Sequence, residues 1–587
     1  MLWMLQSGVI PLLAATPARS QATPLLARGR AALRVPDNRN RLLIVAGWAA
    51  VIALIPPWHE YPVIDDSLYA TSVRDMLATG RFVMPDFSQA NLIAQTVWGT
   101  LWARLFGFGF STLTASTLVL ALAALFAFYG LARAVGVAPG GALLGTALLG
   151  FNPIFIHLSY TFMTDIPFLA LTLGACYGYV RGLGAEGRAR LGWLALAGTL
   201  AGGSFLVRQF GALTPLPFVG LVLWESVRTR RLAWRELLTL VAVPALFGLA
   251  WYVWWRADPP TGAAMAAGAR SAYFIGKEPW LRVFLLRAFT ILPLTALCAW
   301  AALRLPRARW GLVAVIGAAL LWGMWAADLP SEQWIAVFEP PFTARLGPLS
   351  YDLPQEPFSF AAEGNIVKLD GIDFDEFGYA QERIWTMEAW RAIYMGGVAL
   401  VMLLGAALIS ALWDWGRGIR QTWTLTPLAA VYALGAAVFV VSLAFPGDLF
   451  DRYTLAFVPF LLLFLMRGAA GWGRGAWGYS LLALALLATF SLLAKADHMD
   501  QNNARWAAGR WMEARVGAVQ VGWNWNQWGH ASSEGYHVTG IHQEGWRVEQ
   551  EFPYTSRLSG WTTRIVWAES RPDMPPLPSP ITLAPAP

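Results

Sequence analysis

The sequence predicts an all-α polytopic membrane protein with about 13 transmembrane helices. Amphipathic helices on its outer face and a small α/β domain at its C-terminus complete the predicted fold. Of the 587 residues, 57% are hydrophobic and only 13% are charged, whereas a typical soluble domain has about 25% charged residues. The 32 tryptophans agree with this class, because Trp concentrates where a bilayer meets water. The arginines, which alternate with the apolar segments, predict how the helices are oriented.

The apolar segments set the number of predicted spans, since a helix needs roughly 20 apolar residues to cross the hydrocarbon core. Segment 91–110 is apolar too, but it carries Asn91, Gln95 and Arg104. We expect it to form an amphipathic helix in the interface or against the bundle, with a fourteenth span as the alternative. The predicted spans are residues 42–57, 112–132, 138–157, 165–182, 191–207, 210–226, 237–255, 283–303, 310–327, 393–413, 424–445, 452–467 and 476–494.

The charges between the spans predict the orientation. Residues 1–22 have an apolar core but lack the positively charged start of a signal peptide, so we interpret them as part of a cytoplasmic tail. With the N-terminus inside, every loop on the inner side carries Arg, and segment 328–392, outside, has twelve acidic and four basic residues. The C-terminus is then outside as well. Six arginines precede the first span: Arg19, Arg28, Arg30, Arg34, Arg39 and Arg41.

This topology divides the chain into five regions. Within the last region we expect a helix, then a strand over 519–528 and a Pro-rich end. The regions are a cytoplasmic tail (1–41), a first transmembrane module (42–327) with its first outer loop (58–111), an acidic outer loop (328–392), C-terminal transmembrane helices (393–495) and an outer C-terminal domain (496–587).

Three carboxylates are predicted at the outer face. Asp65 and Asp66 open an amphipathic helix expected over 66–79, and Asp165 opens the fourth span with Pro167 in its first turn. Helix capping explains one acid at each helix start, but not two neighbouring acids. Because two spans separate Asp66 from Asp165, both emerge on the same side. This arrangement predicts a site for general base catalysis, metal binding or recognition of sugar hydroxyls.

Basic residues on the same face are candidates for binding a phosphate group. Arg208 ends the fifth span, and Arg452 begins the twelfth in "GDLFDRYTLAFVPF". Lys277 and Arg282 lie among Tyr273, Phe274 and Trp280. For Lys277 and Arg282 the alternative is that each extends along the membrane surface as an anchor.

Three motifs carry a resemblance to a known family: "DDSLYATSVRDMLATGRFVMP", "NPIFIHLSYTFMTDIPFLAL" and "DRYTLAFVPFLLL". Together they resemble the GT-C superfamily of polyprenyl-phosphate-sugar glycosyltransferases. The most similar branch contains the protein O-mannosyltransferases and the bacterial lipid A aminoarabinose transferases. The resemblance implies a bacterial inner-membrane enzyme whose active site is periplasmic. Its implied donor is an undecaprenyl-phosphate sugar, and its acceptor is a lipid, a glycan or a protein.

The resemblance also implies roles for the acids. Asp65 would be the general base, with Asp66 in support and Asp165 as the second acidic position, and the anomeric carbon would be inverted. Relatives often have Lys-Pro-Pro or His-Pro-Pro after the first outer helix, but "PDFSQANLIAQ" has neither. Arg208, Lys277 or Arg452 would then have to contact the phosphate.

Other functions are compatible with the same sequence. A multi-pass transporter or flippase of lipid-linked or sugar substrates is the main alternative, although transporters place charges inside their spans. A sugar-binding scaffold with a Trp-rich tail is another. A retaining mechanism would use a divalent metal held by Asp65, Asp66 and Asp165; no other cofactor is expected. His530, His537 and His542 fit surface histidines better than a metal site. The scattered arginines do not form a nucleic-acid-binding patch.

Overall fold

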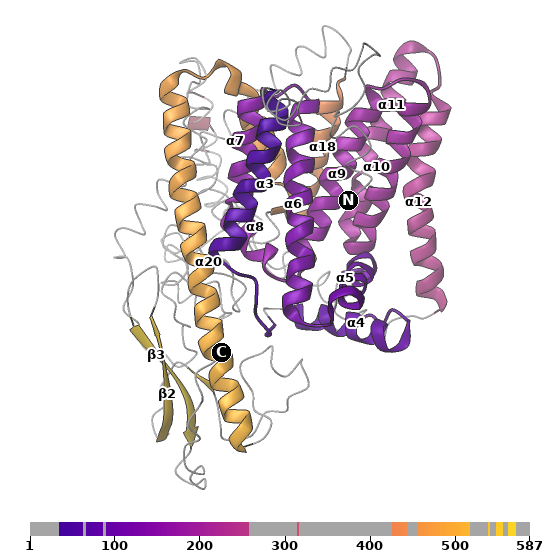
Figure 1. Ribbon diagram of the computed structural model, residues 1–587. Coiled ribbons are helices and arrows are strands. Elements are labelled where there is room, and N and C mark those ends of the chain that lie inside the picture. The colour runs from indigo at the N-terminus through magenta and orange to yellow at the C-terminus, as the bar shows by residue number, and fades with distance from the viewer. Residues whose placement is uncertain are drawn as a thin grey trace, which may run out of the picture.

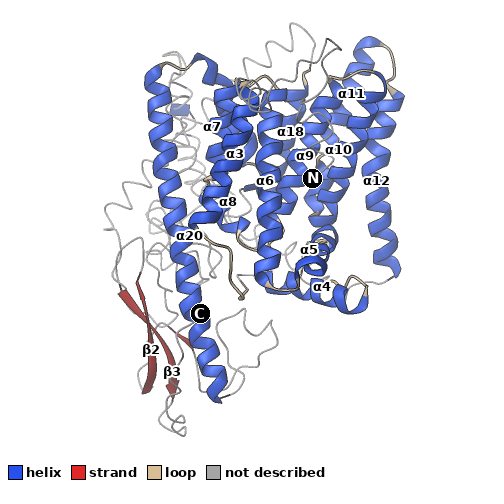
Figure 2. Cartoon of the chain, viewed as in Figure 1, coloured by secondary structure: helices blue, strands red, loops and turns tan. Residues whose placement is uncertain are grey.

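The computed structural model is a bundle of helices with two shorter helices, α4 and α5, at one end (Figure 1). Helices also dominate the view coloured by secondary structure (Figure 2). The structure describes residues 35–62, 66–85, 88, 90–257, 311, 314–315, 318, 425–443, 455–516, 538–539, 547–555 and 562–570.

The helices follow the predicted apolar segments closely. Their bounds are α3 (Pro36–Leu54), α4 (Asp66–Thr79), α5 (Ile93–Phe106), α6 (Phe110–Ala134), α7 (Pro139–Gly150), α8 (Pro153–Ser159), α9 (Asp165–Leu183), α10 (Gly187–Val207), η1 (Gln209–Leu213), α11 (Leu216–Thr229), α12 (Trp234–Ala257), α18 (Pro427–Leu443), α19 (Val458–Met466), η6 (Arg467–Gly471) and α20 (Arg474–Val516).

Within the described residues, six helical segments are long and apolar enough to cross a membrane, or seven if the bent pair α7–α8 is one span. The chain is therefore a helical membrane protein, and the count of thirteen spans stays a prediction. Predicted spans 283–303 and 393–413 lie outside the described residues, as does most of 310–327. The six segments are Phe110–Ala134, Asp165–Leu183, Gly187–Val207, Gln209–Thr229, Trp234–Ala257 and Arg474–Asp500.

The predicted span 138–157 is not one straight helix. It divides into α7 and α8, which are bent by 62° relative to each other. The break follows from two neighbouring residues: Pro153 has no N–H to donate into a continuing helix, and Asn152 caps the new one. The Asn152 Oδ1 atom accepts hydrogen bonds from the backbone N–H groups of Ile154 (2.8 Å) and Phe155 (3.2 Å).

Helix α5 confirms the prediction of an amphipathic helix packed against the bundle. Its 14 residues are too few for a span. Gln95, Gly99 and Ala103 on one face are buried, whereas Val97 and Leu101 on the other are exposed. The buried Gln95 side chain donates a hydrogen bond of 2.6 Å to the Phe162 carbonyl. This bond joins α5 to the segment before α9. Helix α4 also matches its prediction over 66–79.

Small residues allow the long helices to approach one another. A Cβ atom added at Gly202 in α10 would collide with the Phe247 side chain of α12. A Cβ added at Gly182 in α9 would lie 2.8 Å from the Leu194 side chain of α10. These two glycines leave room for the neighbouring side chains, so that α10 packs closely on α12 and α9 on α10.

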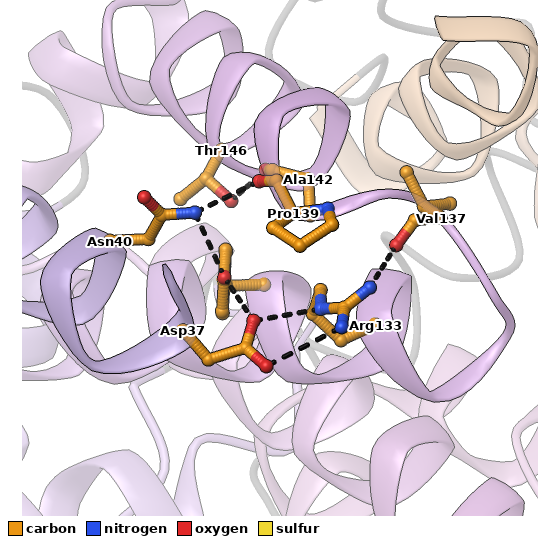
Figure 3. A network of polar contacts seen from close by, with 8 residues as sticks. Asp37, Asn40, Arg133, Val137, Pro139, Ala142 and Thr146 are labelled. Carbon is orange, nitrogen blue, oxygen red and sulfur yellow. Dashed lines mark hydrogen bonds and ion pairs between the residues drawn. The ribbon is translucent and has the colours of Figure 1, made fainter. Parts of the chain in front are cut away.

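A polar network fixes the opposite end of the bundle from α4 and α5 (Figure 3). Asp37, near the start of α3, accepts hydrogen bonds from the Tyr129 hydroxyl (2.6 Å) and from Arg133 Nε (2.8 Å), both in α6. Asn40 donates to the Tyr129 hydroxyl (3.1 Å) and to the Pro139 carbonyl (3.0 Å) at the start of α7. The network therefore ties three helix ends together.

Helix α20 is a single helix of 43 residues. At about 1.5 Å per residue it is about 65 Å long, roughly twice the thickness of a hydrocarbon core. The last predicted span, 476–494, and the helix expected in the tail are thus parts of one element. Its far half extends beyond the bundle, at the same end as α4 and α5 (Figure 1).

Three strands lie beside this far half of α20 (Figure 1). They are β1 (Val538–Thr539), β2 (Arg547–Thr555) and β3 (Thr562–Ser570), in the order β1-β3-β2. Both pairings are antiparallel. The predicted strand over 519–528 and the Pro-rich end lie outside the described residues, and a folded C-terminal α/β domain stays a prediction.

Candidate functional site

Three predicted site residues lie at the same end of the bundle. Helix α4 begins at Asp66, α9 begins at Asp165, and Arg208 directly follows α10. Figure 1 shows these helix ends on the side where α4 and α5 lie. The other predicted site residues are outside the described part of the chain: Asp65, Lys277, Arg282 and Arg452.

Hydrogen bonds from the segment before α5 bring the first loop against the end of α10. The Asn91 side chain donates a hydrogen bond of 2.6 Å to the Phe205 carbonyl, and the Leu92 amide donates one of 3.2 Å to the Val207 carbonyl. Because Arg208 directly follows Val207, these bonds fix the backbone next to Arg208. Two polar residues of segment 91–110, Asn91 and Gln95, therefore serve to dock it on the bundle.

Asp165 and Arg208 form a buried ion pair. Arg208 donates from Nη2 to Asp165 Oδ2 over 2.9 Å and from Nε to the Thr164 hydroxyl over 2.6 Å. The Arg208 side chain is 11% exposed and the Asp165 side chain 4%. Thr164 is the N-cap residue of α9, so Asp165 is its first helical residue. The two residues, predicted for separate tasks, are thus one structural unit.

The backbone around Arg208 explains how its side chain reaches Asp165. Arg208 has an extended conformation (φ −141°, ψ 140°) between α10 and the 3₁₀ helix η1. This break in helical geometry turns the chain at the end of a span. The guanidinium group is thereby directed toward the start of the neighbouring helix α9 instead of continuing along α10.

Asp66 is fully buried, although it begins an outer helix, and its exposed fraction is 0%. It interacts electrostatically with Lys495 of α20. Lys495 is itself 1% exposed, and its Nζ atom lies 5.5 Å from the centroid of the Tyr160 ring. An ammonium group over an aromatic face is attracted by the ring quadrupole. A buried acid and a buried base therefore interact through their charges at this end of the bundle.

Sequence reasoning missed Lys495. It follows directly after the predicted span 476–494 and was assigned to the edge of the membrane region. The available signal was a single Lys within the apolar segment Arg474–Asp500, since ionisable residues in such segments are costly and usually functional.

His59 and Tyr61 connect the first loop to the same place. The His59 ring is close to the Tyr61 carbonyl (3.1 Å) and to the Thr114 hydroxyl (3.3 Å). Burial and the neighbouring charge of Lys495 lower the pKa of His59 from 6.5 to about 4, so the ring is neutral near pH 7. The Tyr61 hydroxyl donates a hydrogen bond of 3.3 Å to the Met499 carbonyl of α20.

We call Asp66, His59, Tyr61, Tyr160 and Lys495 the buried polar cluster. It joins the loop after α3, the start of α4, the end of α8 and the middle of α20. Among the residues that the structure describes, no group of three or more His, Cys, Asp or Glu side chains could hold a metal ion. A metal that involves Asp65 stays an untested alternative, and His530, His537 and His542 lie outside this part of the chain.

Residues 98–255 match the family described as dolichyl-phosphate-mannose-protein mannosyltransferase. Over 208 residues the chain is 27% identical to the undecaprenyl phosphate-alpha-4-amino-4-deoxy-L-arabinose arabinosyl transferase of Edwardsiella ictaluri. The predicted resemblance to the GT-C superfamily is confirmed. The similar region covers 33% of this chain and 36% of that relative, so the chain spans about a third of the relative's length.

Two solved structures show some similarity to this chain. ArnT from Cupriavidus metallidurans, bound to undecaprenyl phosphate, is 17% identical over 80% of each chain, with a TM-score of 0.35. The archaeal oligosaccharyltransferase AglB from Archaeoglobus fulgidus is 13% identical over 81% of this chain and 58% of its own, with a TM-score of 0.43.

Proposed function

We propose that this protein is an integral-membrane glycosyltransferase of the bacterial inner membrane. It would move a hexose or pentose from an undecaprenyl-phosphate donor to a lipid, glycan or protein acceptor at the periplasmic face. The observation that carries the proposal is that the family match over 98–255 contains the buried Asp165–Arg208 pair. This pair lies at the same end of the bundle as the start of α4, where Asp66 lies.

The proposed reaction needs a base and a stabilised leaving group. Asp65 would take the proton from the acceptor hydroxyl, whose oxygen attacks C1 of the sugar. The bond between C1 and the phosphate oxygen breaks, its electron pair stays on the phosphate, and the anomeric carbon is inverted. Proton transfer by a positioned carboxylate typically contributes about 10²–10⁴-fold to the rate.

Arg208 is the described residue best suited to stabilise the leaving phosphate. Its guanidinium is oriented by Thr164 and Asp165, so little reorganisation would be needed when negative charge develops nearby. Lys277, Arg282 and Arg452 remain candidates for the same task. Asp165 would then act mainly by holding Arg208 in place.

The proposal is tested with purified wild-type protein and single Asn variants of Asp65, Asp66 and Asp165 in detergent. Each receives radiolabelled undecaprenyl-phosphate-linked mannose, glucose, galactose and 4-amino-4-deoxy-L-arabinose, with a membrane extract as acceptor. We expect label transfer by the wild type and its loss in Asp65→Asn. Asp75→Asn, a partly exposed acid of the same helix α4, is the matched control and should retain transfer.

A second candidate function is transport of lipid-linked or sugar substrates. The observation in its favour is the buried charge of Lys495, since ionisable groups inside a bundle mark many transport pathways. The same assay separates the two functions. Absence of transfer from all four donors, together with uptake or flipping of a labelled donor in proteoliposomes, would favour the transporter and contradict the transferase.

A further inference from the structure

We propose that Lys495 of α20 is a positioning residue that holds Asp66 and thereby fixes the acidic start of α4 against the bundle. The inference rests on the proposed transferase function, which it deepens by assigning a task to a residue far along the chain. It separates the two neighbouring acids: Asp66 acts as an anchor within the protein, which leaves the base role to Asp65.

Lys495 and Asp66 are both buried, so each charge depends on oppositely charged or hydrogen-bonding neighbours. An ammonium and a carboxylate group removed from water each lose several kcal/mol of solvation, which is recovered only through oppositely charged or hydrogen-bonding neighbours. Lys495 is 1% exposed and Asp66 is 0% exposed, and their charges interact. A carboxylate enclosed in this way is poorly placed to take a proton from an acceptor hydroxyl.

Lys495 is held in place by its surroundings. Its ammonium lies over the Tyr160 ring. The Tyr160 hydroxyl in turn donates a hydrogen bond of 2.7 Å to the Ile55 carbonyl at the end of α3. One turn further along α20, the Met499 carbonyl accepts the hydrogen bond from Tyr61. The charge of Lys495 is therefore fixed relative to both α3 and the loop that leads into α4.

A second contact anchors α20 one turn before Lys495. The Ser491 hydroxyl donates a hydrogen bond of 2.7 Å to the Phe151 carbonyl, at the break between α7 and α8. Ser491 thus contributes to docking α20 but carries no charge. It provides a control that weakens the packing of the helix without altering the charge balance at the start of α4.

The experiment uses the full chain in detergent and measures kcat and the donor KM in the assay described above. The variants are Lys495→Met, Lys495→Arg, Asp66→Asn, the double variant Lys495→Met/Asp66→Asn, and Ser491→Ala as control. We expect Lys495→Met to lower kcat at least tenfold with the donor KM changed less than about twofold, because a misplaced base slows the chemical step. Lys495→Arg, which keeps the charge, should recover part of kcat.

Because the two residues act as one unit, the double variant should be no slower than Lys495→Met alone. Ser491→Ala should keep kcat within about twofold. A higher KM with unchanged kcat in Lys495→Met would show direct contact with the donor and overturn the inference. Wild-type kcat in Lys495→Met, or multiplicative losses in the double variant, would also overturn it.

Loss of folding and failure of the proposed function give different results in this experiment. If Lys495→Met does not fold, Lys495→Arg and the double variant, which leaves no unmatched charge, still carry the comparison. If the wild type transfers label from none of the donors, the transferase proposal fails, and the positioning role fails with it. If the wild type transfers label and Lys495→Met matches it, only the positioning role is wrong.

Discussion

Arg208 Nη2 lies 2.9 Å from Asp165 Oδ2, so the end of α10 and the start of α9 are joined by a pair of opposite charges. Both groups are almost completely enclosed by protein. A substrate phosphate that approaches Arg208 would therefore meet a guanidinium group already oriented by a carboxylate and a hydroxyl. This relationship provides the first of four predictions about stability.

Arg208→Gln should destabilise the protein by about 3–5 kcal/mol, because it leaves the Asp165 carboxylate buried with its main counter-charge removed. The measurement is the free energy of unfolding, or the thermal midpoint, in detergent. Asp165→Asn/Arg208→Gln should be more stable than the sum of the single losses predicts. Arg228 pairs with Glu225 on the surface at 2.6 Å, and Arg228→Gln is the control that should leave stability unchanged. Equal effects at the two arginines would contradict the prediction.

Gly202→Ala should destabilise the packing of α10 on α12 by about 1–3 kcal/mol, since its Cβ would overlap the Phe247 side chain. Gly192 lies in the same helix, and a Cβ added there has open space around it. Gly192→Ala should therefore be neutral or stabilise the protein by up to about 1 kcal/mol. Thermal midpoints of the two variants in one detergent check the pair, and a destabilised Gly192→Ala with a normal Gly202→Ala would refute it.

Asn152→Ala should cost about 0.5–2 kcal/mol, because the Ile154 and Phe155 amides lose the side-chain oxygen that caps α8. Asn152→Ser retains a capping oxygen and should recover most of the loss. The same thermal assay measures both variants. A wild-type midpoint for Asn152→Ala would show that the cap contributes little to stability.

Acidification should destabilise the protein through His59. Its folded-state pKa of about 4 lies below the ordinary value of 6.5, so between these values the unfolded chain binds a proton that the folded protein excludes. The stabilising contribution is complete above about pH 6.5 and declines as the pH falls toward about 4. Between about pH 7 and pH 5 the loss is about 2 kcal/mol.

The control for this pH effect is His59→Gln, which cannot take up the proton. The thermal midpoints of wild type and variant are compared across the same pH series. The difference between the two should shrink as the pH falls. A wild-type midpoint that declines no faster than that of His59→Gln between about pH 7 and pH 5 would mean that His59 is not kept neutral by the fold.

Apolar length and periodicity predicted most of the described helices, because a membrane span must be long and apolar whatever its neighbours are. Periodicity also predicted α4, and the polar residues of segment 91–110 predicted the packing of α5. The bend at Asn152 was missed because hydropathy averages over the residues of a window. A residue-by-residue view finds it in the Asn-Pro pair, which combines a good cap with a missing N–H group.

The site was predicted less completely. Asp66, Asp165 and Arg208 were selected from their positions at helix ends, and the structure places those helix ends on one side of the bundle. That Asp165 and Arg208 pair with each other depends on the packing of α9 against α10, which no local pattern specifies. Lys495 was missed for the same reason, since Asp66, with whose charge it interacts, is more than 400 residues away in the sequence.

This separation has a consequence for how the protein is made. The contact from Tyr61 to Met499 spans 438 residues. At about 5–20 residues per second, a ribosome needs roughly 20–90 s to extend the chain from one to the other. The first loop is therefore synthesised well before the helix that completes its surroundings. A nascent chain released early would carry the entire segment 98–255 and still lack the contact between α20 and the first loop.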